Sequence, residues 1–162
     1  FNKQKVTIPD YLTVCKGFLN QGAKRLHLVD LNAAKKLYSK ATTIVTKIFA
    51  PILLIITLSS HVWLSVWLGV EFADKSWVIA SILSIGIFFN GIAQIPHAVI
   101  QAKGDARLTA LIHLTEFALY IPLLFIAINY FGISGAAGVW VLRTIVDFII
   151  LRTFAKKYFL QN

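Results

Sequence analysis

The sequence predicts an all-α protein, a polytopic membrane helix bundle with about four transmembrane helices. The first observation behind this prediction is composition: 57% of the residues are hydrophobic, only 14% are charged, and the mean hydropathy is +0.72. Soluble domains are less apolar and carry more charge. The second observation is that no Asp, Glu, Lys or Arg occurs between Lys47 and Glu71, or between Lys75 and Lys103. Each of these blocks is long enough, at about 1.5 Å per residue, to cross about 30 Å of hydrocarbon.

The first element is a basic segment over residues 1–41, which we expect on the cytoplasmic side. Residues 6–19 are moderately apolar and contain Pro9, Asp10 and Lys16, so we interpret them as the end of a preceding span. Residues 26–38 are either a basic amphipathic helix on the membrane surface or a solvated connector, and the sequence does not decide between the two.

The four predicted spans make up the second region, residues 42–162, together with a short cytoplasmic tail. Pro51 lies in the first turns of the first span, where neighbouring helices can satisfy the freed carbonyl group. Trp63, Trp67 and Trp77 are placed where aromatic side chains are expected at a membrane interface. The spans cover about residues 43–68, 75–103, 108–131 and 134–154.

The connections between the spans predict the orientation. Eight basic residues precede the first span, Lys103 and Arg107 join the second and third, and three basic residues follow from Arg152 onward. The other two connections hold one lysine beside two acidic residues, or no charge at all. Because lysine and arginine are retained on the cytoplasmic side, both ends of the chain are predicted to be cytoplasmic.

The distribution of charge and the counts of cysteine and methionine exclude several classes of protein. The net charge is +9, but the basic residues flank apolar blocks instead of lining a polar face, so we expect no nucleic-acid partner. Cys15 is the single cysteine, which rules out an internal disulfide framework. The chain contains no methionine and starts at Phe1, so we expect a piece of a longer protein.

No sequence motif predicts an enzyme, a cofactor or a metal centre. There is no phosphate-binding glycine loop, no pair of histidines at zinc spacing and no nucleophile elbow. An enzyme acting on polyprenyl lipids would gather several acidic or histidine side chains in its cytoplasmic loops, and Asp105 alone does not form such a group.

Charged residues inside the predicted spans are the candidate site. A charge at the bilayer centre costs at least about 2.5 kcal/mol, so each one must face protein or water. Arg143 and Asp147 are four residues apart and share a helix face. Glu116 belongs to a similar stripe with His113 and Tyr120 on the third span. The fourth charged residue is Lys47, near the start of the first span.

The second span carries a polar stripe of its own, formed by Asn90, Gln94, His97 and Gln101 at helical spacing. We expect His97, like His61, to be an interfacial side chain, whereas the role of His113 stays open. Two interpretations of the stripes remain. They form either a neutralised cluster that holds helices together, or a water-filled cavity whose positive groups meet an anionic substrate.

The segment 132–143, with the sequence GISGAAGVWVLR and continuing to Asp147, resembles the last span of polysaccharide or O-antigen repeat-unit flippases. These belong to the multidrug/oligosaccharidyl-lipid/polysaccharide exporter superfamily. Supporting similarities are the order and spacing of other short patterns: Leu68-Gly69 with Phe72, Pro96 followed by residues 101–104, and Glu116 with Tyr120. The resemblance covers about residues 19–159 and corresponds to the C-terminal part of the family.

This resemblance implies the last four spans of a twelve-helix, two-lobed transporter of the bacterial inner membrane. Its substrate would be an undecaprenyl-diphosphate-linked oligosaccharide, moved to the outer leaflet without breaking a bond. Its partners would be membrane lipids and the N-terminal lobe, without which the piece should not transport. The substrate-binding residues we expect are Arg143 first and Lys47 second, with Glu116, Asp147, Gln94 and Asn90 around them.

Two other functions fit the same sequence. A cation-coupled exporter of drugs or small molecules from the same superfamily would need buried carboxylates without nearby cations, whereas Arg143 stands beside Asp147. A non-transporting membrane scaffold would use the polar stripes only to pair helices. Hydration of the cavity distinguishes a scaffold from a flippase, because a scaffold would bury Arg143 against carboxylates.

Overall fold

The computed structural model describes residues 31–160 together with residues 13, 16–17 and 20–21. Within the described range all regular secondary structure is helical, as predicted. Its helices are α2 (Leu31–Leu68), α3 (Val70–Ala102) and α4 (Ala106–Leu160). All three are long and apolar enough to cross a membrane.

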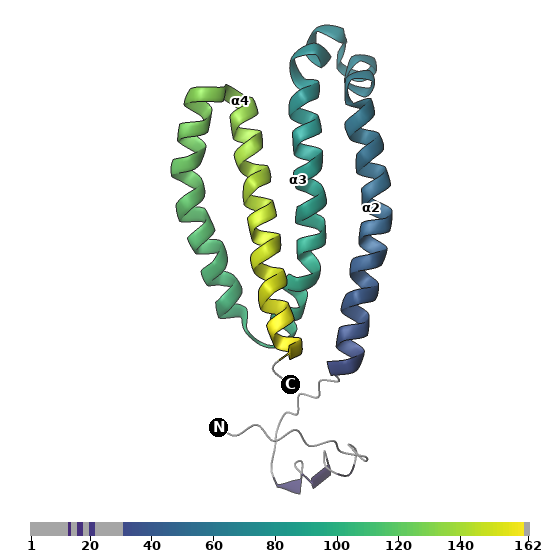
Figure 1. The fold of residues 1–162 in the computed structure, drawn as a ribbon, viewed down its shortest axis with the longest axis vertical. Helices are drawn as coiled ribbons and strands as arrows, with labels where there is room; N and C mark the ends of the chain where they lie inside the picture. The colour runs from purple at the N-terminus through teal and green to yellow at the C-terminus, as the bar shows by residue number, and fades with distance from the viewer. Residues whose placement is uncertain (1–12, 14–15, 18–19, 22–30, 161–162) are drawn as a thin grey trace.

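Helices α2 and α3 run antiparallel, joined by a turn at Gly69 (Figure 1). Gly69 has a φ of 90°, a backbone conformation that side-chain-bearing residues rarely adopt. His61 Nε2 lies 2.7 Å from Asp74 Oδ1 and links the two helices beside this turn. Further along, a Cβ atom on Gly91 would lie 2.6 Å from Cε2 of Phe49, so α2 and α3 pack closely.

Helix α4 folds back on itself at Gly132, where φ is 61° and ψ is −145°. The chain before this residue, 106–131, is called the first arm, and the chain after it, 133–160, the second arm. Figure 1 shows the two arms side by side, running in opposite directions from the bend. A Cβ atom on Gly135 would lie only 2.3 Å from the carbonyl oxygen of Ala127, so the bend requires a small residue there.

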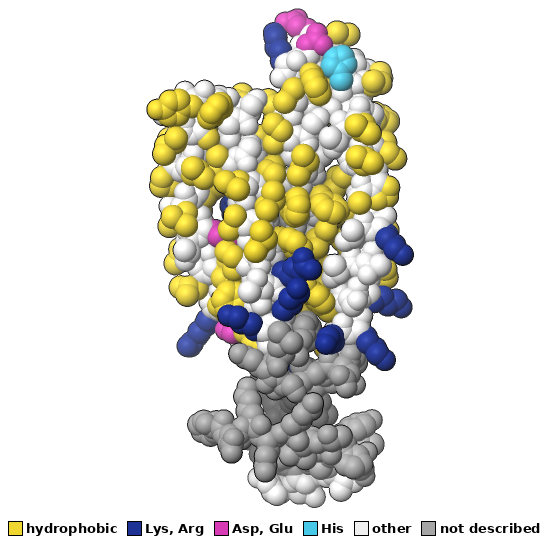
Figure 2. Space-filling model, viewed as in Figure 1, with side chains coloured by type: hydrophobic (Ala, Val, Ile, Leu, Met, Phe, Trp, Pro, Cys, Tyr) yellow, Lys and Arg dark blue, Asp and Glu magenta, His cyan; other side chains and the backbone are white. Residues whose placement is uncertain are grey.

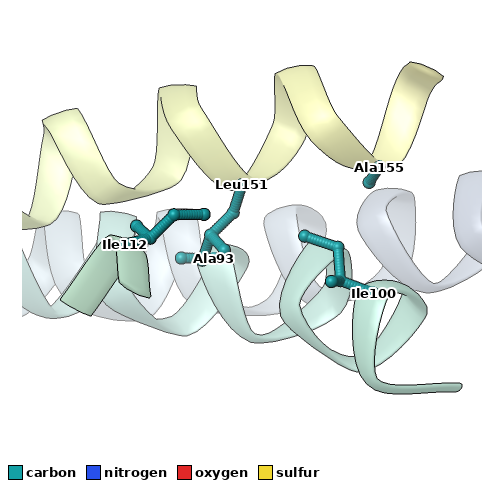
Figure 3. Close-up of a cluster of buried hydrophobic side chains, with 5 residues drawn as sticks. All are labelled: Ala93, Ile100, Ile112, Leu151 and Ala155. Atoms are coloured by element: carbon teal, nitrogen blue, oxygen red, sulfur yellow. The ribbon is translucent and has the colours of Figure 1, made fainter. Parts of the chain in front are cut away.

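Helix α3 lies between α2 and α4 (Figure 1) and contacts both. Its contact with α4 includes a cluster of buried apolar side chains, shown in Figure 3, which joins α3 to both arms. The members are Ala93 and Ile100 from α3, Ile112 from the first arm, and Leu151 and Ala155 from the second arm. The turn between α3 and α4 is held to the end of the second arm, because the Tyr158 hydroxyl donates a hydrogen bond to Asp105.

The surface is apolar over most of its length, as expected of a protein solvated by lipid. Figure 2 shows hydrophobic side chains covering the body of the molecule, with most Lys and Arg side chains toward the end where α2 begins. At the opposite end, a small charged group consists of Glu71, Asp74 and Lys75. Large apolar side chains such as Trp67, Val66 and Leu58 are almost fully exposed. In a soluble protein such a surface would aggregate.

The start of α2 differs from the expected start of the first span. The helix begins at Leu31, twelve residues before residue 43, and residues 41 and 42 lie within it without interruption. Residues 31–38 of the expected amphipathic segment are therefore part of α2. Residues 26–30, and most of the segment 6–19, lie outside the described residues.

Candidate functional site

Polar side chains from three helical segments surround a cavity of about 300 Å³. Helix α3 contributes one side, since three of its polar residues follow one another at helical spacing. The two arms of α4 contribute the others. The lining residues are Asn90, Gln94 and His97 of α3, His113 of the first arm, and Arg143, Asp147 and Leu151 of the second arm.

Two carboxylates and one guanidinium form the charged centre beside this cavity. Arg143 Nε lies 3.7 Å from Oε2 of Glu116. His113 Nδ1 lies 3.6 Å from the same Glu116 oxygen and 3.6 Å from Oδ1 of Asp147. The imidazole therefore sits between the two carboxylates, and the first and second arms are coupled through these groups.

Burial differs between the acidic and the basic members of this centre. Glu116 and Asp147 are each only 8% exposed, because both lie on the helix faces that meet between the arms. The side chain of Arg143 is 37% exposed, with its guanidinium 5.8 Å from the centre of the Tyr120 ring. The cation is thus the more accessible partner and can reach a molecule in the cavity.

Several polar atoms at the centre are buried without a hydrogen-bond partner among the described residues. They are His113 Nδ1, both carboxylate oxygens of Glu116, and Oδ1 of Asp147. Their contacts of 3.6 to 3.7 Å are longer than ordinary hydrogen bonds, and an unpaired buried polar group is costly. Water or a polar ligand in the cavity is the natural partner for the atoms that border it.

The same three side chains have the spacing of a cation site, with ligand atoms of His113, Glu116 and Asp147 all within 4.8 Å of one another. The Arg143 guanidinium stands 3.7 Å from Glu116 and already supplies one positive charge. This guanidinium offsets one of the two carboxylate charges and so weakens the attraction of the centre for a divalent metal ion.

Four residues expected at a binding site come together in the cavity: Arg143, Asp147, Gln94 and Asn90. Glu116 lies directly beside it through its contacts with Arg143 and His113. Lys47 is exposed on α2 and is not among the residues that line the cavity.

Two histidines that line the cavity were not predicted from the sequence as binding-site residues. His97 was expected at the interface, but it lines the cavity with its ring centroid 5.7 Å from that of His113. The signal was present in the spacing, because His97 follows Gln94 by three residues and His113 precedes Glu116 by three. Both histidines share a face with a residue of the site.

Comparison with known proteins supplies a relative. Over 126 residues, or 78% of this chain, the sequence is 35% identical to a protein of Shigella flexneri named "Putative O-antigen transporter". The chain is therefore related to proteins of the O-antigen transporter type. This confirms the resemblance seen in the sequence, and the chain spans 30% of the length of that O-antigen transporter. No protein-family model matches the chain, and no solved structure matches it.

The relationship and the structure agree on the class of protein. Three long apolar helices with a lipid-compatible surface, in a chain related to an O-antigen transporter, make it a multi-pass membrane protein. Among the described residues, α3 and the two arms enclose a polar cavity. Helices can pack against one another in lipid without such a cavity.

Proposed function

We propose that this chain is the C-terminal part of a flippase for undecaprenyl-diphosphate-linked oligosaccharide repeat units. The flippase would carry them from the inner to the outer leaflet of the bacterial plasma membrane for surface polysaccharide synthesis. The observation that carries the proposal is the open polar cavity around Arg143 in an otherwise apolar bundle, in a chain related to an O-antigen transporter. No bond is broken in such a transfer, so the protein is proposed not to be an enzyme.

The proposed topology has four membrane crossings: α2, α3, and the first and second arms of α4. The bend at Gly132 supports two crossings within α4, since each arm exceeds the roughly 20 residues needed to span a bilayer. Basic residues at the opposite end from this bend support a cytoplasmic location for both ends. In the complete transporter these crossings would be the last four of twelve, arranged in two lobes around a central path.

Within the cavity, Arg143 is proposed as the main contact for substrate oxygen atoms, because its planar guanidinium can donate two parallel hydrogen bonds. Asn90 and Gln94 would contact the substrate from α3, and Asp147 would contact it from the same arm as Arg143. Glu116, buried at 8% exposure, would orient the guanidinium from behind.

Lys47 is proposed to meet the substrate outside this cavity, on the exposed face of α2. Lys36 and Lys40 are also exposed, and with Lys47 they fall within about 40° of one another around the helix axis. No acidic residue occurs anywhere in α2 to neutralise them. The three lysines therefore make a basic face suited to phosphate groups.

The alternative function is a cation-coupled exporter of small molecules from the same superfamily. The buried pair of carboxylates, Glu116 and Asp147, is the observation in its favour. The Arg143 guanidinium beside Glu116 argues against it, since it offsets one of the two carboxylate charges that would hold a coupling cation.

The test is transfer of lipid-linked oligosaccharide in cells that depend on the complete transporter for surface polysaccharide. Arg143 is replaced by Ala and, separately, by Lys, and the oligosaccharide remaining on the cytoplasmic leaflet is measured at equal amounts of inserted protein. Ala should block transfer, and Lys should restore part of it because the charge returns without the planar fork.

The matched control is Arg152→Ala, which removes an arginine from the same arm at an exposed position outside the cavity. This control should transfer normally. If Arg143→Ala transfers like Arg152→Ala, or only lowers the amount of folded protein, the guanidinium has a structural role and the proposal fails.

A further inference from the structure

We propose that the cavity binds a hydroxyl-rich sugar ring of the substrate and not its diphosphate. This inference rests on the proposed function and names the part of the substrate that the cavity recognises. It departs from the interpretation that the positive groups of the cavity meet an anionic part of the substrate. Three properties of the described residues carry it: the missing hydrogen-bond partners, the charge of the lining, and the amides at the rim.

The atoms without hydrogen-bond partners need donors. Three of the four are carboxylate oxygens of Glu116 and Asp147, which are acceptors when ionised. A sugar hydroxyl donates a hydrogen bond and can pair with the carboxylate of Asp147, a residue that lines the cavity. A diphosphate presents only acceptor oxygens when ionised, so it would leave this carboxylate unpaired and place negative charge against it.

The charge of the centre points the same way. Glu116 and Asp147 supply two negative charges and Arg143 supplies one positive charge, so the fixed groups sum to one negative charge. His113 lies between the two carboxylates, and the ring of His97 on α3 lies 5.7 Å from that of His113. A polyanion therefore finds little net attraction here, whereas an uncharged ring is not penalised.

The rim of the cavity offers the mixed chemistry that hydroxyl groups require. Asn90 and Gln94 are exposed and line the cavity, and each amide carries two N–H donors and a carbonyl acceptor. A hydroxyl group is both donor and acceptor and can pair with either end. The volume of about 300 Å³ corresponds to about ten water molecules, which is room for one monosaccharide ring and not for a chain of several.

The experiment uses this chain reconstituted in lipid nanodiscs and detects weak binding by saturation-transfer NMR. The probes are the methyl glycosides of glucose and N-acetylglucosamine, the cationic sugar glucosamine, and sodium pyrophosphate as a competitor. We expect saturation transfer to the uncharged glycosides, with no displacement by pyrophosphate at equal concentration. Displacement by pyrophosphate, binding of glucosamine alone, or no binding of any glycoside would overturn the inference.

Two variants locate the binding. Asn90→Leu combined with Gln94→Leu should weaken glycoside binding by about tenfold or more, since several hydrogen bonds are lost at once. Arg152→Ala, at an exposed position of the second arm outside the cavity, is the control and should bind glycoside like the unmodified chain. Equal binding by the double variant and the control would place the sugar elsewhere and contradict the inference.

A third variant keeps the shape of the cavity in case the double variant fails to fold. Asp147→Asn removes one negative charge and should let pyrophosphate compete, because Arg143 then faces one carboxylate instead of two. Failure of pyrophosphate to compete in this variant would contradict the charge argument. These outcomes are independent of the proposed function, because transfer can depend on Arg143 whether or not the cavity selects a sugar ring.

Discussion

Gly86 and Trp140 determine how closely the arm that carries Arg143 approaches α3. A Cβ atom added to Gly86 would lie 2.2 Å from Cζ3 and 2.7 Å from Cε3 of Trp140. Trp140 is one helical turn before Arg143, so the indole packed on Gly86 helps to hold the guanidinium at the cavity. The absence of a side chain at residue 86 is therefore a requirement of the packing.

Gly86→Ala is expected to destabilise the protein by about 1–3 kcal/mol, the usual cost of inserting atoms into a packed core. The indole must move, and Arg143 should shift with it. Thermal unfolding in detergent measures the effect. Gly138→Ala is the matched control, since a Cβ atom there meets nothing within 4 Å, and it should unfold at an equal or higher temperature. Equal loss in both variants would contradict the account.

The sequence predicted individual site residues where a charge stood in an apolar block. Glu116, Arg143 and Asp147 were conspicuous because lipid tolerates few charges, and the structure brings them within contact of one another or of His113. His113 and His97 were harder to assign, because a neutral imidazole is acceptable at an interface. Lys47 was expected as the second substrate contact after Arg143, and only the packing of α2 shows that it lies outside the cavity.

At the scale of elements, the bend in α4 brings Glu116 of the first arm against the second arm, which carries Arg143 and Asp147. Gly132 makes this bend with a φ of 61° and a ψ of −145°, a combination that only glycine adopts without strain. Without this reversal, Glu116 and Arg143, which are 27 residues apart, could not approach within 3.7 Å. The sequence predicted a break at this place, because the third and fourth spans were expected at about residues 108–131 and 134–154.

Gly132→Ala should cost about 1–3 kcal/mol of stability, because the new side chain forces a strained backbone conformation. The control is Ser134→Ala, two residues away, at an exposed position in the second arm. Chemical unfolding monitored by circular dichroism compares the two variants. A Gly132→Ala protein as stable as the control would show that the bend does not depend on glycine.

At the scale of the whole molecule, the predicted helical bundle followed from the simplest physical constraint, because backbone groups in lipid must be satisfied by helices. The start of α2 could not be predicted in the same way. Residues 31–42 contain several lysines, so their hydropathy does not indicate a membrane span. They are helical because they continue the apolar part of α2. The cavity also depends on how α3 meets both arms, which residue spacing within one helix does not reveal.

The proposed orientation can be tested with single cysteines, since Cys15 is the only native one and Cys15→Ser removes it. Phe72→Cys and Ser134→Cys lie at one end of the bundle, and Ala106→Cys lies at the other; all three positions are exposed. A membrane-impermeant thiol reagent added to intact cells whose outer membrane has been made permeable should label the first two. Labelling of Ala106→Cys instead would reverse the proposed topology.

The cavity around Arg143 is proposed to be a water-filled binding site and not a dry cluster that joins helices. The most direct measurement is the reaction of Gln94→Cys, in the Cys15→Ser background, with a water-soluble thiol reagent, because this reaction requires a hydrated thiolate. The control is Leu114→Cys, which is 66% exposed but belongs to the apolar outer surface. With membranes open to the reagent on both sides, the account predicts rapid modification at residue 94 and little at residue 114. Equal protection at both positions would contradict it and leave the charged residues with a structural role.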